Sequence, residues 1–474
     1  MKIGARRTKI VCTIGPSSSS VQMLEKLVLA GMDVARLNFS HGEHAYHAKS
    51  FENIHIAGER AGKKVAVLQD LGGPKIRLGT LNQPQLKLHT GGRVTLVSGQ
   101  SAQGDEIPVN YPYLDEDVAP GEKILLADGL VELLVEERKG SRLICSVVTG
   151  GELTSHKGVN LPTSHLRVSA FTDKDRSDLA FGISLGIDMV AMSFVRDESD
   201  LSLIREILQA SENPQMLIAK IEKPQAIDGL AGILSVVDGV MVARGDLGVE
   251  MPYEMLPMAQ KRIINAARRA GKPVIVATQM LRSMIESPRP TRAEATDVAN
   301  AIFDGADAVM LSEETAIGSY PLEAVGALER IAMVTEKEFT ADRFLSEVDS
   351  PLLPPVEAAI SRAACEIALK LNATLIVAST LSGKTARLVA RFRPPMPILG
   401  VTSVERAFNS MAISWGVTSA MISHTERFTE LCAISEKYAK ENGLASAGDR
   451  IVITAGYPVK SGGSTDLLKV ITVK

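Results

Sequence analysis

The chain has 474 residues, 45% of them hydrophobic and 23% charged, and this length exceeds what one ordinary core supports, so we expect two or three domains. A formal net charge of −3 and an aromatic content of 4% argue against nucleic acid or a membrane surface as a partner. No apolar run is long enough to span a membrane, and four cysteines without metal-ligand or redox spacing indicate reduced thiols and a cytoplasmic location.

Eight short runs of β-branched and apolar residues alternate with helical stretches. Strands that alternate with helices predict a parallel sheet, and eight such units predict a (β/α)8 TIM barrel. The pattern stops once, after residue 70, and segments 1–71 and 161–341 together have about 250 residues, the usual size of such a barrel. The predicted strands are residues 9–15, 34–40, 65–70, 189–194, 216–222, 239–246, 274–280 and 308–314.

Residues 72–160, which interrupt the barrel pattern, do not alternate between strands and helices. They contain alternating segments at 86–88 and 93–96, and the stretch 124–135 carries Asp128-Gly129, a pair typical of a hairpin turn. We predict a small antiparallel β-barrel domain here. Because a domain inserted after a barrel strand lies over the mouth of the barrel, we expect it to act as a lid.

The last part of the chain, residues 342–474, starts with a proline-rich stretch and returns to mixed helices and strands. A helix is predicted over 356–372, and strands over 375–380, 398–403, 449–456 and 468–473. These elements predict an open α/β domain of ordinary size.

Polar residues gather where the predicted barrel strands end, and active sites of such barrels lie at those carboxyl ends. Glu222 and Asp246 could share a hard divalent cation, and Lys220 could hold negative charge beside it. The site therefore suits an anionic, phosphorylated substrate. The candidates are Arg36, Asn38, Ser40 and His41, then Asp70 and Arg77, Lys220 and Glu222, Arg244 and Asp246, Thr278, and finally Ser312, Glu313 and Glu314.

Each candidate also has an ordinary structural explanation. Lys220 and Glu222 could form an ion pair, and Arg36 could pair with Asp70 on the next strand. Asp246 could cap a helix, although the flanking glycines favour close approach of a ligand. Taken singly, Asn38, Ser40, His41, Thr278 and Lys157 are typical of turns, strands and solvated loops.

A second candidate site lies between a strand and a helix of the last domain. Thr380, Ser382, Lys384 and Thr385 bring hydroxyls and an ammonium group to a helix start, which predicts an anion pocket. The spacing is not that of a nucleotide P-loop, and simple N-capping by Thr380 or Ser382 is the alternative. Its place in the chain suits regulation rather than catalysis.

Nine segments, in order and covering nearly the whole chain, resemble the pyruvate kinase family. The resemblance implies transfer of a phosphoryl group from phosphoenolpyruvate to ADP, giving pyruvate and ATP, the last step of glycolysis. It also implies a homotetramer and an allosteric site for a phosphorylated sugar or a nucleotide. The segments are KIVCTIGPSS (9–18), VARLNFSHG (34–42), GPKIRLG (73–79), KGVNLP (157–162), AKIEKPQAI (219–227), MVARGDLGVE (241–250), KPVIVATQML (272–281), PRPTRAEATDVANAIFDGADAVMLS (288–312) and SGKTARLVARFRP (382–394).

The resemblance also implies roles for single residues. Glu222 and Asp246 would bind Mg²⁺ or Mn²⁺, and Lys220 would stabilise the phosphoryl group in flight. Arg36, Thr278 and the backbone at Gly245 and Asp246 would hold phosphoenolpyruvate. The nucleotide would be reached by Asn38, His41, Arg77 and Lys157, and the effector phosphate by Thr380, Ser382, Lys384 and Thr385.

Two positions depart from the common family pattern. Many members need K⁺ and have a threonine and a glutamate where this chain has Leu71 and Lys75. The K⁺ ligands would otherwise map to Asn38, Ser40, Asp70 and residue 71. Losing a hydroxyl and reversing a charge disfavours a bound cation, and the ammonium of Lys75 could take its place. We therefore predict activity without K⁺.

Two rival functions are compatible with part of this pattern. Another Mg²⁺-dependent barrel enzyme of pyruvate or phosphoenolpyruvate chemistry, an aldolase or a mutase, would share the acidic pair but would need neither the lid nor the last domain. A catalytically idle sensor of sugar phosphates is disfavoured, because Lys220, Glu222 and Asp246 are all present.

Overall fold

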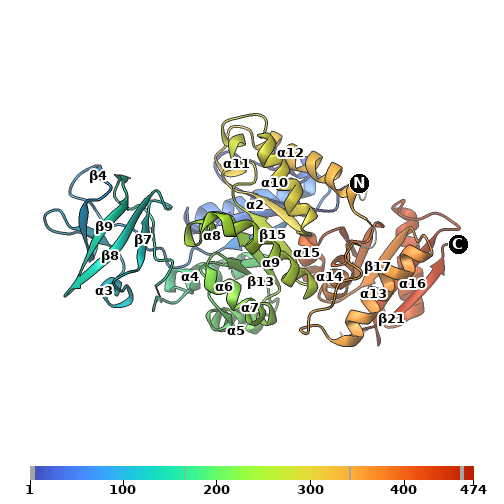
Figure 1. The fold of residues 1–474 in the computed structure, drawn as a ribbon. Helices are drawn as coiled ribbons and strands as arrows, with labels where there is room; N and C mark the ends of the chain where they lie inside the picture. Colours follow the sequence, from blue (N-terminus) through green and yellow to red (C-terminus); the bar gives the residue numbers. More distant parts are fainter. Residues whose placement is uncertain (1–5, 165, 341–342, 459–463) are drawn as a thin grey trace.

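The computed structural model describes residues 6–164, 166–340, 343–458 and 464–474 (Figure 1). Eight parallel strands close into a barrel in which each strand pairs with its chain neighbours and β1 also pairs with β16. The (β/α)8 prediction is confirmed strand by strand. The strands are β1 (Lys9–Thr13), β2 (Val34–Asn38), β3 (Ala66–Asp70), β12 (Met189–Met192), β13 (Met216–Ile221), β14 (Gly239–Ala243), β15 (Val274–Ala277) and β16 (Ala308–Leu311).

The barrel strands are apolar on both faces because both faces are buried. On β1, Ile10 and Cys12 pack outward against the helices, whereas Val11 packs into the barrel interior. Such continuous burial explains why these strands read as unbroken apolar runs.

Helices surround the barrel, and several begin at a side-chain cap. Thr172 with Asp175 and Thr291 with Glu294 form reciprocal capping boxes, which fix where their helices start. The main helices are α1 (Val21–Ala30), α2 (His44–Arg60), α4 (Asp173–Leu185), α5 (Ser202–Ala210), α7 (Leu230–Val236), α9 (Leu256–Arg269), α10 (Arg292–Phe303) and α12 (Pro321–Thr335). Shorter ones are η1 (Glu198–Leu201), α6 (Pro224–Asp228), α8 (Arg244–Glu250), η2 (Tyr253–Met255), η3 (Arg282–Ile285), α11 (Glu313–Ala316) and η4 (Glu336–Glu338).

Four aspartates make the same contact at the amino end of the barrel, and each directly precedes an alternate strand. A carboxylate oxygen of each accepts the backbone N–H of a residue at the start of the preceding strand. This contact ties the strands together in pairs. The bonds run from Ile10 to Asp33 (2.9 Å), Val67 to Asp188 (2.8 Å), Leu217 to Asp238 (2.9 Å) and Val274 to Asp307 (3.1 Å).

The insertion after β3 is a β domain with its own apolar core, and Figure 1 shows it projecting from one end of the barrel. Strands β7 and β8 form the hairpin expected around Asp128-Gly129, where both residues have positive φ (57° and 86°). One pairing differs from the antiparallel expectation, because β5 and β6 are parallel. The elements are β4 (Leu86–Leu88), β5 (Arg93–Ser98), β6 (Ile107–Val109), α3 (Leu114–Asp117), β7 (Lys123–Leu126), β8 (Val131–Lys139), β9 (Arg142–Thr149), β10 (Gly151–Leu153) and β11 (Val159–Asn160).

The C-terminal part is an α/β unit with a five-stranded sheet in the order β19-β18-β17-β20-β21, and it packs at the end of the barrel away from the insertion (Figure 1). The four predicted strands are present, but β19 was missed, because this edge strand is half polar (VTSAM). The elements are α13 (Pro355–Lys370), β17 (Leu375–Ser379), α14 (Lys384–Ala390), β18 (Ile398–Thr402), α15 (Glu405–Ser410), η5 (Met411–Ile413), β19 (Val417–Met421), α16 (Phe428–Glu441), β20 (Arg450–Gly456) and β21 (Thr465–Thr472).

The domain boundaries 71/72 and 160/161 stay a prediction, and the predicted boundary at 341/342 lies outside the described residues. Within the described part of the chain, no helix is both long and apolar enough to cross a bilayer.

Candidate active site

Lys220, near the end of β13, carries a buried ammonium group that contacts three oxygens. Its Nζ lies 2.7 Å from Glu222 Oε1 and 3.3 Å from Asp70 Oδ1, and it donates a 2.7 Å hydrogen bond to Ser193 Oγ. Burial lowers the pKa of Lys220, but Asp70, Glu222 and Asp246 outweigh burial and raise it above the ordinary value. Lys220 is therefore held charged at the carboxyl end of the barrel.

Glu222 and Asp246, the predicted metal pair, lie close enough to influence each other. Glu222 is buried, and its Oε2 accepts a 2.8 Å hydrogen bond from Phe194 N–H. Burial raises the pKa of Glu222 to about 7, Lys220 opposes that rise, and the charge of Asp246 adds to it. A cation between the two carboxylates would relieve this cost of ionisation.

The donor set fits Mg²⁺, which binds through one or two carboxylates and fills its other positions with water and substrate oxygens. Asp246 is exposed and borders a cavity, and its carboxylate forms no hydrogen bond or ion pair with any other described residue. It is the third residue of α8, whose N-cap is Ala243, so the capping alternative does not hold. No group of three or more acidic, histidine or cysteine side chains suited to a metal occurs in the described residues.

Arg36, on β2, points its buried guanidinium group toward the same cluster. Its Nε lies 2.7 Å from Asp70 Oδ2, and its NH1 donates a 2.8 Å hydrogen bond to Thr13 Oγ1. Asp70 thus bridges Arg36 and Lys220, and it places two cations on one side of the rim.

Thr278 follows β15 in a left-handed conformation with φ of 67°, which is unusual for a β-branched residue. Its Oγ1 accepts a 2.7 Å hydrogen bond from Gly245 N–H. Arg244 holds this turn, because its NH2 donates to Thr278 O at 2.8 Å while its NH1 pairs with Asp297 at 2.6 Å. Arg244 is therefore a positioning residue, and the strained threonine faces the start of α8.

The residues expected to reach a nucleotide fall into two groups. Arg77 and Lys157 border a cavity of about 820 Å³ between the inserted domain and the barrel, and Asp246 borders it too. The two segments that carry them are joined, because Leu78 N–H donates to Lys157 O at 2.8 Å. Asn38 and His41 are not among the described residues that border this cavity; Asn38 instead accepts the N–H of Ser40 at 3.1 Å.

Leu71 and Lys75, which depart from the K⁺-dependent pattern, both lie near Asp70. The side chain of Leu71 is buried in the barrel core, and its carbonyl accepts the hydroxyl of Ser193 at 2.7 Å. Burial, then Arg77 and Lys220, lower the pKa of Lys75, whereas Asp70 and Asp246 oppose this. The ammonium of Lys75 therefore lies within electrostatic reach of the Asp70 cluster.

Ser193 and Thr13 also belong to the cluster but were missed as candidates. Both stand at the carboxyl end of a barrel strand, and their hydroxyls contact Lys220 and Arg36, respectively. The rule that found the charged residues would have found them, had hydroxyls at every strand end been included.

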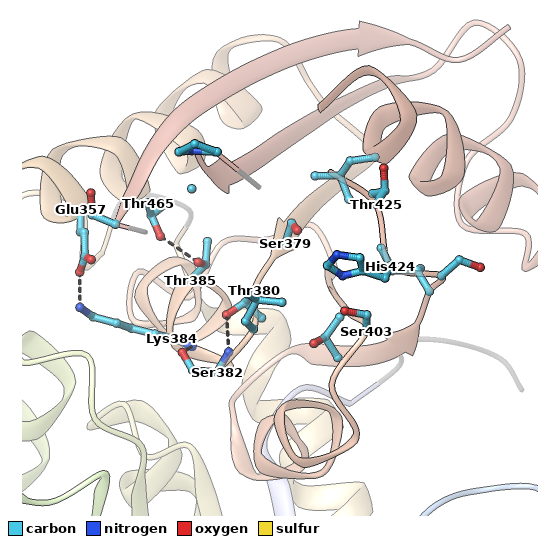
Figure 2. A pocket seen from close by; sticks show the side chains of 18 residues that line it. Glu357, Ser379, Thr380, Ser382, Lys384, Thr385, Ser403, His424, Thr425 and Thr465 are labelled. Carbon is cyan, nitrogen blue, oxygen red and sulfur yellow. Dashed lines mark hydrogen bonds and ion pairs between the residues drawn. The ribbon is translucent and has the colours of Figure 1, made fainter. Parts of the chain in front are cut away.

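The second candidate site is a cavity of about 180 Å³ in the C-terminal unit, which brings together Thr380, Ser382, Lys384 and Thr385 (Figure 2). The N-cap of α14 is Gly383, but Ser382 Oγ accepts the N–H of Lys384, the first residue of this helix, and Thr380 Oγ1 accepts the N–H of Ser382, both at 3.4 Å. Local backbone capping therefore accounts for part of the role of these two hydroxyls. Lys384 Nζ pairs with Glu357 Oε2 at 2.5 Å, and Thr385 Oγ1 lies 2.8 Å from Thr465 Oγ1.

Comparison with known proteins identifies the family. The fold and the site define a barrel enzyme that handles anionic substrates with a cationic, carboxylate-lined rim. Residues 5–325 match the model "Pyruvate kinase, barrel domain", and residues 358–471 match "Pyruvate kinase, alpha/beta domain". The chain belongs to the pyruvate kinase family.

Individual proteins that are similar to this chain are also pyruvate kinases. The chain is 46% identical to a pyruvate kinase of Geobacillus stearothermophilus over 98% of this chain and 80% of the relative. It is 42% identical to that of Clostridium acetobutylicum over 99% and 100%. A crystal structure of a pyruvate kinase from Cryptosporidium parvum superposes with a TM-score of 0.93 at 36% identity, covering 99% of this chain and 97% of that one.

The family membership fixes the reaction. The chain is a phosphotransferase of glycolysis that acts on phosphoenolpyruvate and ADP to give pyruvate and ATP, and the family depends on Mg²⁺. The aldolase and mutase alternative is not favoured by any of these matches.

Proposed function

We propose that Lys220 is the residue that neutralises the phosphoryl group in flight. The observation that carries this proposal is its buried ammonium group, fixed between Glu222 and Asp70 at the carboxyl end of the barrel. Phosphoryl transfer needs positioning and charge stabilisation more than covalent help from the protein. A charged lysine held by carboxylates meets that need and moves little during the reaction.

Glu222 and Asp246 hold Mg²⁺ or Mn²⁺ beside Lys220. The support is the raised pKa of the buried Glu222 and the unpaired state of Asp246 among the described residues. When bound, the ion would supply Lewis-acid charge that polarises the phosphoryl oxygens.

Phosphoenolpyruvate lies between Arg36, Thr278 and the start of α8. Arg36 contributes a second fixed cation, and the N–H of Gly245 donates to Thr278 Oγ1, which holds the threonine against the start of α8. The nucleotide occupies the cavity bordered by Arg77 and Lys157. Asn38 and His41 do not border this cavity among the described residues, and they would have to reach the nucleotide from the barrel rim. Closure of the inserted domain over this cavity would exclude water, which otherwise competes for the phosphoryl group.

Substitution of Lys220 tests this assignment. Lys220→Met should lower kcat by roughly 10²–10³-fold, because it removes charge at the transferring group. The matched control is Lys9→Met, which removes another buried strand lysine whose Nζ donates to Val417 O away from the rim. The measurement is coupled, ADP-dependent release of pyruvate. Wild-type turnover in Lys220→Met, or equal losses in both variants, would contradict the role.

K⁺ is not required, because Lys75 supplies the missing charge near Asp70 and Leu71 provides no side-chain oxygen. Activity measured with Mg²⁺ in K⁺-free buffer should equal activity with K⁺ added. Strong stimulation by K⁺ would contradict this.

The C-terminal cavity binds a phosphorylated sugar or nucleotide effector through Thr380, Ser382, Lys384 and Thr385. Lys384→Ala should abolish responses to phosphorylated metabolites while leaving basal turnover near wild type, as read in assays with and without each metabolite. If every response survived this change, the pocket assignment would be wrong.

The protein assembles as a homotetramer in the cytoplasm. Large apolar side chains on η2 and the start of α9 support self-association, since Tyr253, Met255 and Met258 are 83%, 53% and 63% exposed. Four free, buried cysteines support a reducing compartment. Light scattering on the purified chain measures the assembly directly.

A further inference from the structure

A cavity of about 360 Å³ lies between the amino end of the barrel and the C-terminal unit, away from the candidate active site. The residues before β14 and β15 contribute Asp238 and Lys272 to one wall. Helices α14 and α15 contribute Arg387 and Arg406 to the other. Nothing in the reaction described above uses this cavity.

Positive charge dominates the lining. Among the described residues that border the cavity, four are cations and one is a carboxylate: Lys272, Lys384, Arg387, Arg406 and Asp238. The carboxylate is already engaged, because Asp238 Oδ2 lies 3.0 Å from Arg205 NH1 and accepts the N–H of Leu217 at 2.9 Å. Lys384 is paired with Glu357, which borders only the effector pocket. Three cations therefore face the cavity without a free carboxylate to match them.

The donors of these three residues are poorly satisfied. Arg387 NH1 is buried without a hydrogen-bond partner, and the guanidinium group of Arg406 makes no hydrogen bond or ion pair within the described part of the chain. Lys272 Nζ donates to Val237 O at 2.7 Å. Burial lowers the pKa of Lys272 to about 8; Asp238 opposes this, and Arg387 lowers the pKa further. Leaving a buried donor such as Arg387 NH1 unpaired is costly unless a ligand satisfies it, whereas Lys272 and Arg406 are half-buried.

We propose that this cavity is a second anion site, which binds the phosphate of a small phosphorylated metabolite between Arg387, Arg406 and Lys272. Guanidinium groups bind phosphate through paired, charge-assisted hydrogen bonds, and Lys272 adds a point charge. The volume leaves room for a small organic group attached to the phosphate.

The site is joined to the effector pocket by a common wall. Leu381, Ser382 and Lys384 border both cavities, so a ligand in either one meets the same loop. The anion site does not require the effector assignment to be correct, but an experiment has to separate the two pockets.

Inorganic phosphate is the probe, compared with chloride at equal ionic strength in buffer without Mg²⁺. Thermal unfolding of the full chain is followed through Trp415, the only tryptophan, which is buried and donates its backbone N–H to Asp307 at this interface. Phosphate should raise the Tm of the wild type in a saturable manner, because a ligand that binds the folded state stabilises it. Arg387→Gln/Arg406→Gln should lose about half of this rise or more, and should need roughly tenfold more phosphate for half of the effect.

Two controls locate the effect. Arg427→Gln removes an exposed arginine of the same unit and should respond to phosphate like the wild type. Thr380→Val/Thr402→Val changes residues that border only the effector pocket, and the arginine-dependent part of the response should survive there.

A wild-type response in the arginine variant would overturn the proposal. Loss of the response only in the threonine variant would also overturn it, while supporting the effector pocket. If the double arginine variant fails to fold, Arg406→Gln alone decides, since this guanidinium group has no hydrogen bond in the described structure whose loss would destabilise the fold. Arg406→Lys, which keeps the charge, should retain most of the response.

Discussion

At the scale of single residues, the site is defined by which charges touch. Lys220 contacts Glu222 just after its own strand, Asp70 from β3 and Ser193 after β12, and Asp70 also contacts Arg36. One carboxylate therefore fixes two cations. This arrangement explains why a lysine and two acids on one rim act together rather than as separate ion pairs.

Two single residues, Leu71 and Lys75, are expected to decide whether the enzyme needs K⁺. The double change Leu71→Thr with Lys75→Glu should create K⁺ dependence, because it restores a hydroxyl and a carboxylate near Asp70 while removing the ammonium group that stands in for the ion. Turnover without K⁺ should fall by at least about tenfold and recover when K⁺ is added. Initial rates across a KCl series, with NaCl holding the ionic strength, measure this.

The control for this prediction is Lys75→Glu alone. It reverses the charge but leaves Leu71 in the barrel core, so its K⁺ response should be weaker than that of the double variant. An inactive double variant that K⁺ cannot rescue would contradict the idea that Lys75 replaces the cation.

At the scale of elements, the loop between β17 and α14 is restrained by a neighbouring helix. Glu357 in the first turn of α13 is buried, and it pairs with Lys384 across the mouth of the effector pocket (Figure 2). The pair holds in place the ammonium group that an effector phosphate would need. An entering phosphate therefore competes with an internal carboxylate.

Glu357→Gln should make the enzyme more sensitive to its effector. Without the carboxylate, Lys384 is free for phosphate, and the effector concentration for half-maximal response should fall roughly three- to tenfold. Activity titrations with the effector measure the shift. Glu366→Gln, on the same helix, is the matched control and should leave the titration unchanged. An unchanged midpoint in Glu357→Gln would show that the pair does not compete with the ligand.

At the scale of the whole molecule, the four aspartates at the amino end of the barrel differ in the other groups that their carboxylates contact. Asp33 faces Arg6 and Lys63, at 2.9 Å and 2.8 Å. Asp188 instead accepts a 2.6 Å hydrogen bond from Asn409, and Asp307 contacts Arg393 and Trp415. An aspartate at this position of the repeat therefore either stabilises the barrel alone or also contacts the C-terminal unit.

These surroundings predict opposite pH effects for Asp33 and Asp188. Burial by itself raises the pKa of both, but around Asp33 the cations Arg6, Lys63 and Lys9 outweigh burial and lower it. Asp33 then stabilises the fold above the unfolded pKa near 4, and this contribution is lost as pH falls below that value. Asp188, whose pKa is raised to about 6, gives stability that declines as pH rises from about 4 to 6.

Urea denaturation across pH tests this contrast. Asp33→Asn should lower the free energy of unfolding at pH 7 by about 3 kcal/mol, because it leaves buried cations unpaired. Asp188→Asn should change stability by less than about 1 kcal/mol and flatten its pH dependence between about 4 and 6, since Asn409 can turn its unsatisfied Oδ1 toward the new amide. Equal losses in both variants at pH 7 would contradict the assignment.

The sequence by itself determined the barrel, the family and the charged residues of the cluster around Lys220, but not the hydroxyls of Ser193 and Thr13. The eight strands are readable because each is buried on both faces and must be apolar throughout, and polar residues therefore stand out at their ends. Strand β19 was not predicted from the sequence, because it lies at the edge of its sheet, where half of its side chains can be polar.

Only the tertiary structure decided which charges are partnered and which are left over. The contact of Lys384 with Glu357 joins residues 27 positions apart, and the cluster at Arg387 and Arg406 faces Lys272 across two parts of the chain. A linear pattern records the kind of residue at each position, but a charge is neutralised through space, over a few ångströms. Whether Lys272 or Arg406 meets a carboxylate therefore depends on how the C-terminal unit docks against the barrel.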